Sequence, residues 1–298
     1  MQRYLTSEED SARWLGFRFR PGDIVISTRR RTGTTWLQTI CGLLIFQTPE
    51  LPAPLWHLSP WLDHRIEPPA WVHARLDAQP HRRFIKTHTP LAALPYDPRV
   101  TYLVSGRHPL DTHVSLCRHL SNLHGTPAPD LRLALLRWIA TDESAESLPA
   151  VLHHATDAWQ RAWLPNVVLV HYDQLTADLP GQMRYLAARL GIPVPEPLWP
   201  VLTASATLPR MRERATHLVP GFFHDARAFF PRGSPGAAAE LLTPTELSAY
   251  YTSAATLAPP EILTWLHGHQ SPAAAAQGVR GGRRPVDRPQ TPGAAEHQ

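Results

Sequence analysis

The chain has 298 residues, which is long for one ordinary domain and short for two well-developed ones. Hydrophobic residues make up 43% of it, enough for a core. The net charge of +4 is mildly basic, which excludes a polycationic protein and suits a small anionic ligand as well as it suits nucleic acid.

The chain ends and the cysteines bear on the location of the protein. Residues 1–20 are charged and polar, unlike a signal peptide, and no run of about 18 apolar residues occurs that would span a membrane. Cys41 and Cys117 each stand in an apolar segment, which indicates no disulfide framework. We therefore expect a cytoplasmic protein with no membrane partner. We also expect one domain over 1–270 and a disordered tail over 271–298, where Ala, Gly, Pro, Arg and Gln follow no period.

The stretch Asp23–Ile40 combines an apolar run, a polar loop and a helical pattern. Ile24–Ile26 predicts a strand, and apolar residues at helical spacing predict a helix over about 34–46. The loop between them carries three arginines, Gly33 and several hydroxyl groups. A helix N-terminus offers unpaired N–H groups and partial positive charge, so this order of elements predicts a site for an anion such as phosphate.

This loop differs from the nucleotide-binding P-loop, G-x-x-x-x-G-K-[ST]. No glycine stands five residues before Gly33, and Thr34 occupies the place of the lysine. The difference disfavours a Mg-triphosphate site. An arginine-rich solvated loop is the structural alternative. Within the loop, we expect Arg29 and Arg30 to be surface charges and not ligands.

Residues 47–80 are rich in proline and tryptophan, and we expect irregular structure there. The many large aromatics argue against a disordered linker. The segment forms either part of an acceptor pocket or a lid packed on the core. Trp56, Trp61 and Phe17 are candidate contacts for an acceptor.

The remainder of the chain alternates strand and helix patterns. Strands are predicted at 83–86, 100–104 and 167–170, and helices at about 110–120, in two pieces within 130–163, and at 179–190. Such alternation predicts an α/β fold, a single domain with a central parallel sheet flanked by helices and joined by right-handed crossovers. Val167–Val170 is continuously apolar, as in a strand buried on both faces.

Ligands of parallel sheets bind at the carboxyl ends of the strands. The loops after the four predicted strands carry Arg31–Thr35, Lys86–His88, Arg107 and Tyr172. We therefore expect these residues to lie side by side. Lys86 is also the only lysine of the chain.

Three of these loops resemble motifs of the cytosolic-type sulfotransferase family, which uses 3′-phosphoadenosine 5′-phosphosulfate (PAPS). Arg31–Trp36 resembles its P-K-S-G-T-T-W loop, and Lys86–Pro90 resembles its K-T-H-x-P strand end. Arg107, Asp111 and Ser115 resemble its R-[ND]-P-x-D-x-x-x-S segment, which holds the 3′-phosphate. The three motifs follow the family's order and spacing within the first 120 residues. The resemblance implies a P-loop-like phosphosulfate-binding loop after the first strand.

Two further segments are similar to later motifs of the family. Tyr172-Asp173 resembles a Y-E-D strand end whose tyrosine contacts adenine, and Phe229–Gly236 resembles an F-x-R-K-G-x-x-G loop that closes over the 3′-phosphate. The residues that the resemblance implies as contacts of PAPS are Arg31, Thr32, Gly33, Thr34, Thr35, Trp36, Arg107, Ser115, Tyr172, Arg232 and Gly233.

The resemblance also implies catalytic roles. His88 takes the proton from the hydroxyl or amine of a small-molecule acceptor, which suits a group with an ordinary pKa of about 6.5. Arg31 and Lys86 stabilise charge on the bridging oxygen. No metal is implied, because the cations are side chains.

The chain departs from the family at several positions. Arg31 stands where the family has lysine, and an arginine cannot donate a proton to the leaving phosphate. Ala206 and Leu208 stand where an adenine-side threonine and phenylalanine are expected, and Pro231 replaces a phosphate-binding arginine.

Two other functions compete with sulfuryl transfer. One is a P-loop-type kinase of nucleotides or small molecules, and the other is a nucleic-acid-binding protein that uses Arg29–Arg31 and the arginines of the tail. The first lacks the G-K-[ST] sequence, and the second gives His88 no role. We therefore expect a sulfotransferase with a small-molecule acceptor and no nucleic-acid partner.

Overall fold

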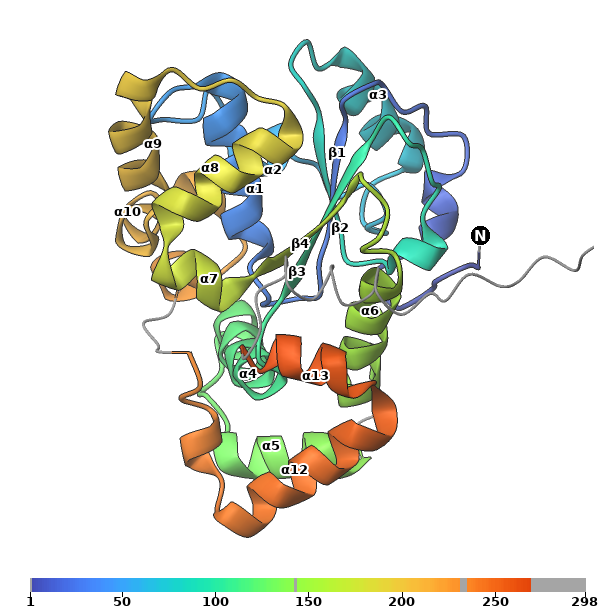
Figure 1. The fold of residues 1–298 in the computed structure, drawn as a ribbon, viewed down its shortest axis with the longest axis vertical. Helices are drawn as coiled ribbons and strands as arrows, with labels where there is room; N and C mark the ends of the chain where they lie inside the picture. Colours follow the sequence, from blue (N-terminus) through green and yellow to red (C-terminus); the bar gives the residue numbers. More distant parts are fainter. Residues whose placement is uncertain (1, 142–143, 231–234, 269–298) are drawn as a thin grey trace, which may run out of the picture.

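The structure is a computed structural model of the chain, and it describes residues 2–141, 144–230 and 235–268. Its centre is a four-stranded parallel sheet in the order β2-β1-β3-β4 (Figure 1). The strands are β1 Ile24–Ser27, β2 Phe84–Thr87, β3 Thr101–Gly106 and β4 Val167–His171. Because Ile26 pairs with both Lys86 and Leu103, the carboxyl ends of neighbouring strands meet at one edge.

Helices flank the sheet and continue past its carboxyl edge. The α-helices are α1 Thr34–Phe46, α2 Leu55–Leu58, α3 Pro69–Ala78, α4 Pro109–His124, α5 Leu131–Thr141, α6 Leu148–Gln160, α7 Tyr172–Ala177, α8 Leu179–Leu190, α9 Trp199–Ala206, α10 Leu208–Glu213, α11 Ala215–Leu218, α12 Pro244–Leu257 and α13 Pro260–Leu266. The 3₁₀ turns are η1 Ser11–Trp14, η2 Leu91–Ala93, η3 Glu196–Leu198, η4 Arg227–Phe229 and η5 Ala239–Leu241.

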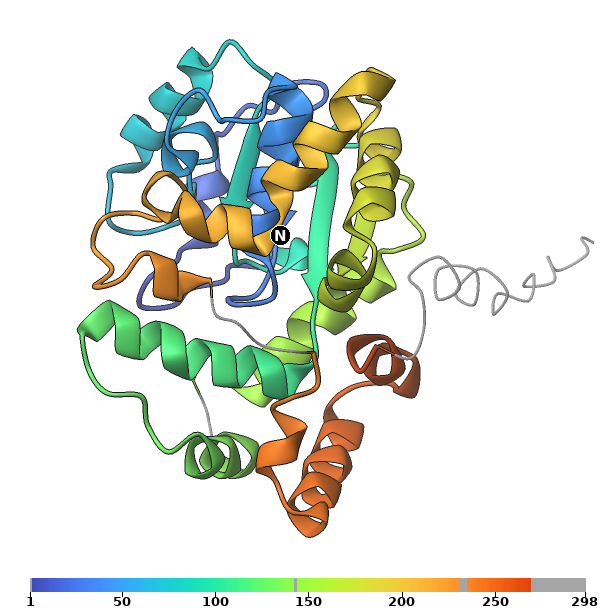
Figure 2. The same ribbon diagram turned by 90° about the vertical axis from the view of Figure 1, so that its left-hand side faces the viewer.

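Successive strand residues alternate between two hydrophobic clusters, one on each face of the sheet. Ile24 and Ile26 pack with residues of α1, α8 and α9, whereas Val25 packs with residues of α3, α6 and α12. Side chains of a strand point alternately to opposite faces, so strands covered on both sides are apolar throughout. Figures 1 and 2 show α4, α5, α12 and α13 beyond the carboxyl ends of the strands.

The predicted fold class is confirmed, with a parallel sheet and a polar loop between β1 and α1. The helix expected at about 34–46 is α1, and the four predicted strands are present within one or two residues of their expected ends.

The expectation of irregular structure throughout 47–80 is wrong, because α3 occupies Pro69–Ala78. Proline is tolerated in the first turn of a helix, where its missing N–H has no intrahelical partner to lose. Val72 and Leu76, four residues apart on α3, are buried in the core. Burial of these two side chains on one face stabilises a helix in a segment whose composition indicates a loop.

Several expectations concern the chain as a whole. The tail at 271–298 lies outside the described residues, and the domain over 1–270 stays a prediction. Cys41 and Cys117 are both free thiols. Within the described part of the chain, no helix is both long and apolar enough to cross a bilayer.

Candidate active site

The loops after the strands meet at the carboxyl edge of the sheet, as the sequence predicts. An Nη1 donor of Arg107, at the end of β3, lies 3.0 Å from the carbonyl oxygen of Arg31, in the loop after β1. At the end of β2, Nδ1 of His88 lies 2.5 Å from the carbonyl oxygen of Thr28. The three loops therefore form one continuous site.

The loop between β1 and α1 has an unusual backbone. Arg31 has φ = 67° and Gly33, the N-cap of α1, has φ = 115°. A Cβ at Gly33 would also lie 3.3 Å from the ring of Tyr172. Glycine meets both demands, since it adopts positive φ freely and has no Cβ. The loop can therefore pass close beneath the aromatic ring.

The first turn of α1 offers donors to a ligand. Among the described residues, no side chain caps this turn. The N–H groups of Thr34, Thr35 and Trp36 have no acceptor inside the helix, as in the first turn of any helix. Together with the positive end of the helix dipole, these donors make a site for an anion.

Buried hydroxyl groups hold this loop in shape. Oγ1 of Thr34 lies 2.6 Å from Oγ1 of Thr28, and Oγ1 of Thr32 donates to the carbonyl of Arg29 at 2.7 Å. Ser105 of β3 contacts the Thr32 hydroxyl at 2.7 Å. Two of the three predicted hydroxyl ligands thus also brace the loop. Thr35 is half-buried in the first turn.

Arg31 lies among acceptors that the protein itself supplies. Its Nε donates to Oγ of Ser115 at 3.1 Å, and its Nη2 donates to the carbonyl of Phe229 at 2.8 Å. The guanidinium also stacks on the Phe229 ring, 4.5 Å from its centre, and lies 3.4 Å from Nδ1 of His119. Burial, and then the charge of Arg107, lower the pKa of Arg31 to about 10, so it remains a cation at neutral pH.

Arg107 and Ser115 come together near Arg31. The guanidinium of Arg107 lies over the ring of Tyr172, 4.3 Å from its centre, while its buried Nε has no hydrogen-bond partner among the described residues. The nearby carboxylate of Asp111 accepts instead from the backbone N–H groups of Gly236 and Ala238. A buried donor without a partner is costly, which favours an acceptor from a ligand there.

His88 is held in one tautomer. A carbonyl oxygen can only accept, so Nδ1 of His88 carries the proton that it shares with Thr28, and Nε2 keeps its lone pair. Burial, and then the charges of Lys86 and Arg30, hold the pKa of His88 well below its ordinary value. His88 is therefore a neutral imidazole whose Nε2 can accept a proton.

Lys86 and His88 share an aromatic neighbour. Nζ of Lys86 lies 4.0 Å from the ring centre of Trp61, and the imidazole of His88 meets the same indole edge-on at 4.7 Å. Burial, and then the charge of Arg30, lower the pKa of Lys86 to about 8. Lys86 is thus a cation with a proton that it can release near neutral pH.

Trp36 and Tyr172, the predicted adenine contacts, touch each other with ring centres 5.2 Å apart. Trp36 is only 4% exposed, and its indole N–H donates to the carbonyl of Ala206 at 2.8 Å. Tyr172 begins α7, where the sequence indicates a loop. The adenine role of both residues stays a prediction.

The expectation that Arg29 is a surface charge is wrong. Arg29 is 2% exposed, forms an ion pair with Glu146 at 2.9 Å and donates to the hydroxyl of Tyr4 and the carbonyl of His88. Arg30, with 15% of its side chain exposed, contacts Glu146 at 3.2 Å and also pairs with Glu8. Carboxylates from distant segments compensate these charges, as buried charges require.

Sequence analysis missed Asp63 and two contacts of Arg31. Asp63 is fully buried and accepts hydrogen bonds from Thr87 and Thr89 on either side of His88, and His119 and the Phe229 carbonyl contact Arg31. The only sequence feature that could have drawn attention to Asp63 is its place as an acidic residue within a segment rich in proline and tryptophan.

Of the three aromatic candidates for acceptor contacts, only Trp61 packs against Lys86 and His88 among the described residues. Phe17 packs on Arg83, directly before β2 and so at the opposite edge of the sheet, and Trp56 packs on His57. Arg232 and Gly233 lie outside the described residues.

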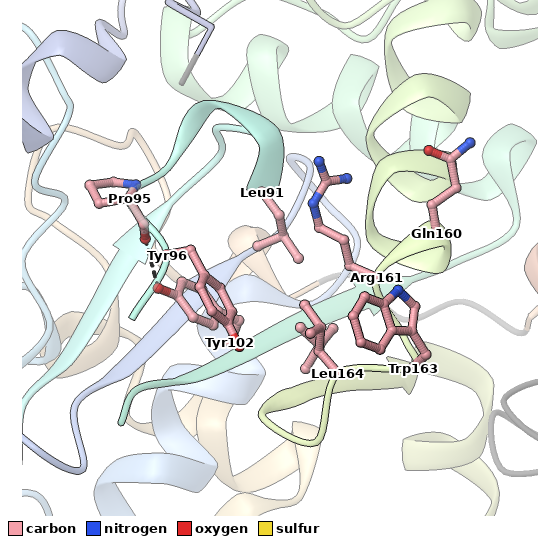
Figure 3. Close-up of a pocket in the computed structure, with 9 residues that line it drawn as sticks. Leu91, Pro95, Tyr96, Tyr102, Gln160, Arg161, Trp163 and Leu164 are labelled. Atoms are coloured by element: carbon pink, nitrogen blue, oxygen red, sulfur yellow. Dashed lines mark hydrogen bonds between the residues drawn. The ribbon is translucent and has the colours of Figure 1, made fainter. Parts of the chain in front are cut away.

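A separate pocket lies at the amino ends of β3 and β4 (Figure 3). Its cavity of about 480 Å³ is lined by Leu91, Pro95, Tyr96, Tyr102, Gln160, Arg161, Trp163, Leu164 and Val167. None of the predicted site residues lines it. Among the described residues, no three His, Cys, Asp or Glu side chains are grouped as metal ligands. This observation does not test the expectation of a metal-free site, which stays a prediction.

Comparisons with known proteins point to one family. The sequence profile of the sulfotransferase domain matches residues 21–252. A glycolipid sulfotransferase of Mycobacterium bovis is 36% identical, over 89% of this chain and 93% of its own length. Sulfotransferase 1A1 of the dog, Canis lupus familiaris, is 25% identical over 74% of this chain and 78% of its own length.

Solved structures share the fold. Retinol dehydratase in complex with androsterone and the inactive cofactor PAP aligns with a TM-score of 0.66 at 18% identity, over 83% of both chains. Mouse sulfotransferase SULT7A1 complexed with PAP also has a TM-score of 0.66 at 18% identity, over 90% of this chain and 93% of its own. With a domain match over most of its length and a relative more than one-third identical, this chain belongs to the sulfotransferase family.

Proposed function

We propose that the protein transfers a sulfuryl group from PAPS to a hydroxyl or amine of a small-molecule acceptor, with His88 as the general base. One observation carries the proposal. The uncapped N-terminus of α1, the unpartnered Nε of Arg107 and a neutral His88 all occur at one edge of the sheet. Anion donors and a base in one site suit transfer between an anionic donor and a protic acceptor.

In this proposal, two anion sites hold the donor. The N–H groups of Thr34–Trp36 bind the 5′-phosphosulfate, and Gly33 allows its close approach. Arg107 and Ser115 bind the 3′-phosphate, where the unpartnered Nε of Arg107 gains an acceptor. Trp36 and Tyr172 are assigned to the adenine side, as predicted from the sequence. Solved relatives that bind PAP support this assignment.

The chemistry follows from the protonation states. The acceptor oxygen or nitrogen attacks sulfur, its proton passes to Nε2 of His88, and the bond from sulfur to the bridging oxygen of PAPS breaks. The products are a sulfated acceptor and adenosine 3′,5′-bisphosphate. Arg31 and Lys86 stabilise the charge on the bridging oxygen. Of the two, Lys86 can also give up a proton, because its pKa lies near 8 while that of Arg31 lies near 10.

The acceptor class to test first is a glycolipid hydroxyl. The glycolipid sulfotransferase of Mycobacterium bovis is more than one-third identical to this chain over nearly its full length. A sugar hydroxyl is also a proton donor that a neutral imidazole can deprotonate as the new bond forms. The cytoplasmic location of the protein also stays a prediction.

The structure gives less support to the alternatives. The nucleic-acid hypothesis needs Arg29 and Arg30 as exposed cations, yet both form ion pairs with Glu146 and Arg29 is buried. The kinase hypothesis needs a P-loop lysine, and Thr34 occupies that position with its hydroxyl against Thr28.

Ligand-induced stabilisation separates the two enzyme hypotheses. At about 100 times its dissociation constant, adenosine 3′,5′-bisphosphate should raise the free energy of unfolding by about 2.7 kcal/mol. Thermal unfolding with this ligand, with adenosine 5′-monophosphate and with ATP–Mg tests the proposal. Adenosine 5′-monophosphate lacks the phosphate assigned to Arg107 and Ser115, so it should stabilise less. Stabilisation by ATP–Mg alone would contradict the proposal.

Turnover identifies the acceptor. Incubation with PAPS and a panel of glycolipids, phenols and amines, followed by mass spectrometry of the products, should show a sulfated acceptor. Binding of the bisphosphate without any sulfated product in a broad panel would support the donor site alone.

A further inference from the structure

The segment before α3 forms a short parallel extension beside β2. The N–H of Lys86 donates to the carbonyl of Pro60 at 3.0 Å, and the N–H of Leu62 donates to the carbonyl of Lys86 at 3.3 Å. The next residue, Asp63, is therefore placed beside the end of β2. Its side chain is 0% exposed.

One oxygen of Asp63 collects three donors from two parts of the chain. Oδ2 accepts from the indole N–H of Trp14 at 2.8 Å, from Oγ1 of Thr87 at 2.5 Å and from Oγ1 of Thr89 at 2.7 Å. The N–H of Thr89 donates in turn to Oγ1 of Thr87 at 3.0 Å. Asp63, Thr87 and Thr89 thus form a closed ring of hydrogen bonds around the backbone of His88.

The arrangement is expensive for a purely structural contact. Burial of a carboxylate is costly, and among the described residues no Lys or Arg forms an ion pair with Asp63. Its second oxygen, Oδ1, is buried and has no hydrogen-bond partner there. Burial accordingly raises the pKa of Asp63. A cluster of apolar side chains would fill this space at lower cost.

The position of the His88 ring depends on this turn. Its Nδ1 has to reach the carbonyl of Thr28 at 2.5 Å while Nε2 remains accessible to an acceptor. With only two side-chain torsions, the imidazole can satisfy this requirement from a narrow range of backbone conformations. Thr87 and Thr89 fix that backbone from both sides, and both are bonded to Asp63.

We propose that Asp63 is a positioning residue for sulfuryl transfer, which holds the Thr87–Thr89 turn so that His88 presents Nε2 to the acceptor proton. The inference rests on the proposed role of His88 as the base. Asp63 contacts neither substrate and acts through the two threonines. Displacement of a catalytic group by about 1 Å can cost about 100-fold in rate, so a residue of this kind affects turnover strongly.

The first test replaces the carboxylate. Asp63→Ala should lower kcat by about 100-fold while the dissociation constant of adenosine 3′,5′-bisphosphate stays within about threefold, because the helix N-terminus is untouched. Asp63→Asn keeps an oxygen that can accept from the threonines, so it should recover most of the lost turnover. Asp157→Asn is the matched control, since this buried carboxylate contacts Arg161 and Ala92 away from the site. It should alter thermal stability without altering kcat.

A double-mutant cycle separates positioning from general damage. If Asp63 acts through His88, Asp63→Ala should cause no further loss of turnover in a His88→Ala background. An equal loss in both backgrounds, or wild-type kcat in Asp63→Ala alone, would overturn the inference. Wild-type turnover in His88→Ala alone would instead overturn the proposed base.

A second pair of variants decides the matter if Asp63→Ala does not fold. Thr89→Val removes one hydroxyl at almost constant volume, and Thr89→Ser keeps it. We expect Thr89→Val to lower kcat by about tenfold and Thr89→Ser to remain within about threefold of wild type. Equal kcat values for the two variants would count against the inference.

The position of the ring is also measurable without turnover. In protein with ¹⁵N-labelled histidine, the His88 imidazole signals, assigned by their loss in His88→Ala, should shift in Asp63→Ala and in Thr89→Val and stay close to their wild-type positions in Asp63→Asn and Thr89→Ser. Unchanged signals would show that the ring does not depend on Asp63.

Discussion

Two neighbouring strand ends carry His88, the proposed base, and Arg31, a proposed cation of the site, and they are built differently. At the end of β2, the threonines on either side of His88 are bonded to the buried Asp63, and the ring itself is bonded to the carbonyl of Thr28. In the loop after β1, Arg31 donates to Ser115 and to the carbonyl of Phe229. The contacts of His88 leave its Nε2 available to a substrate. The guanidinium of Arg31, in contrast, already donates hydrogen bonds to acceptors of the protein.

The difference indicates two modes of action. The proposed base is preorganised, so no hydrogen bond of Nε2 has to break before it accepts a proton. Arg31 has to exchange neutral acceptors for a charged one when an anion arrives. That exchange is favourable, because charge-assisted hydrogen bonds are roughly twice as strong as neutral ones. We therefore expect substitutions at the end of β2 to affect the chemical step, and substitutions at Arg31 to affect donor binding as well.

The largest expected effect follows from removal of the base. His88→Ala should lower kcat by about 10²- to 10⁴-fold, the usual contribution of a general base, and should leave the affinity for adenosine 3′,5′-bisphosphate nearly unchanged. Steady-state kinetics and calorimetric titration measure the two quantities. His153→Ala, the same change at an exposed histidine of α6, is the control. Wild-type turnover in His88→Ala would refute the assignment of the base.

A smaller effect is expected at Arg31. Arg31→Ala removes one stabilising donor and should lower kcat by about 10²- to 10³-fold, as does loss of a single transition-state donor elsewhere. It should also weaken the affinity for PAPS, unlike His88→Ala.

The matched variant Arg31→Lys restores the charge as a flexible ammonium. It should return turnover to within about tenfold of wild type, although an ammonium cannot reproduce the planar, multiply bonded geometry of the guanidinium. If Arg31→Ala and Arg31→Lys are equally impaired, the planar guanidinium and its contacts with Ser115 and Phe229 matter more than its charge. If turnover is impaired in neither variant, Arg31 has no catalytic role and serves only to hold the loop through its contacts with Ser115 and Phe229.

The parts of the site that the sequence predicts are those formed by contiguous residues. The strand, loop and first helical turn of Ile24–Trp36 lie within a few residues of one another, and so does the strand end Lys86–Pro90. In a parallel sheet, covalent order and the common direction of the strands bring these segments to one edge. Local patterns therefore suffice to place Arg31, His88 and Arg107 together.

The parts that the sequence does not predict depend on distant partners. The buried Arg29 pairs with Glu146, which lies just before α6, and the side chain of Arg31 is held by the carbonyl of Phe229. Asp63 reaches Thr87 and Thr89 only because 60–62 pairs with the end of β2. No local periodicity records such contacts, and the burial of a charged side chain is decided by them.

The smallest expected effect is a change in the shape of the pH profile, and it tests Lys86 and His88 separately. The value of kcat/KM for PAPS reports groups of the free enzyme. Burial and Arg30 lower the pKa of Lys86 to about 8, so the charged form, which we propose to stabilise the bridging oxygen of PAPS, is lost as pH rises through 8. Above that point kcat/KM should fall by about tenfold per pH unit. His88 has a pKa well below 6.5, so its neutral form, and hence activity, should persist below pH 6.5.

Lys86→Arg identifies the group behind the alkaline limb. A guanidinium keeps its proton beyond pH 10, so this variant should lose the limb near pH 8 and keep the acid limb. A second buried group titrates in the same range, because burial and Asp63 raise the pKa of Glu9 to about 8. Glu9 gains a negative charge as pH rises, which also opposes an anionic donor. An alkaline limb that survives in Lys86→Arg but disappears in Glu9→Gln would assign the titration to Glu9 and leave Lys86 as a fixed cation.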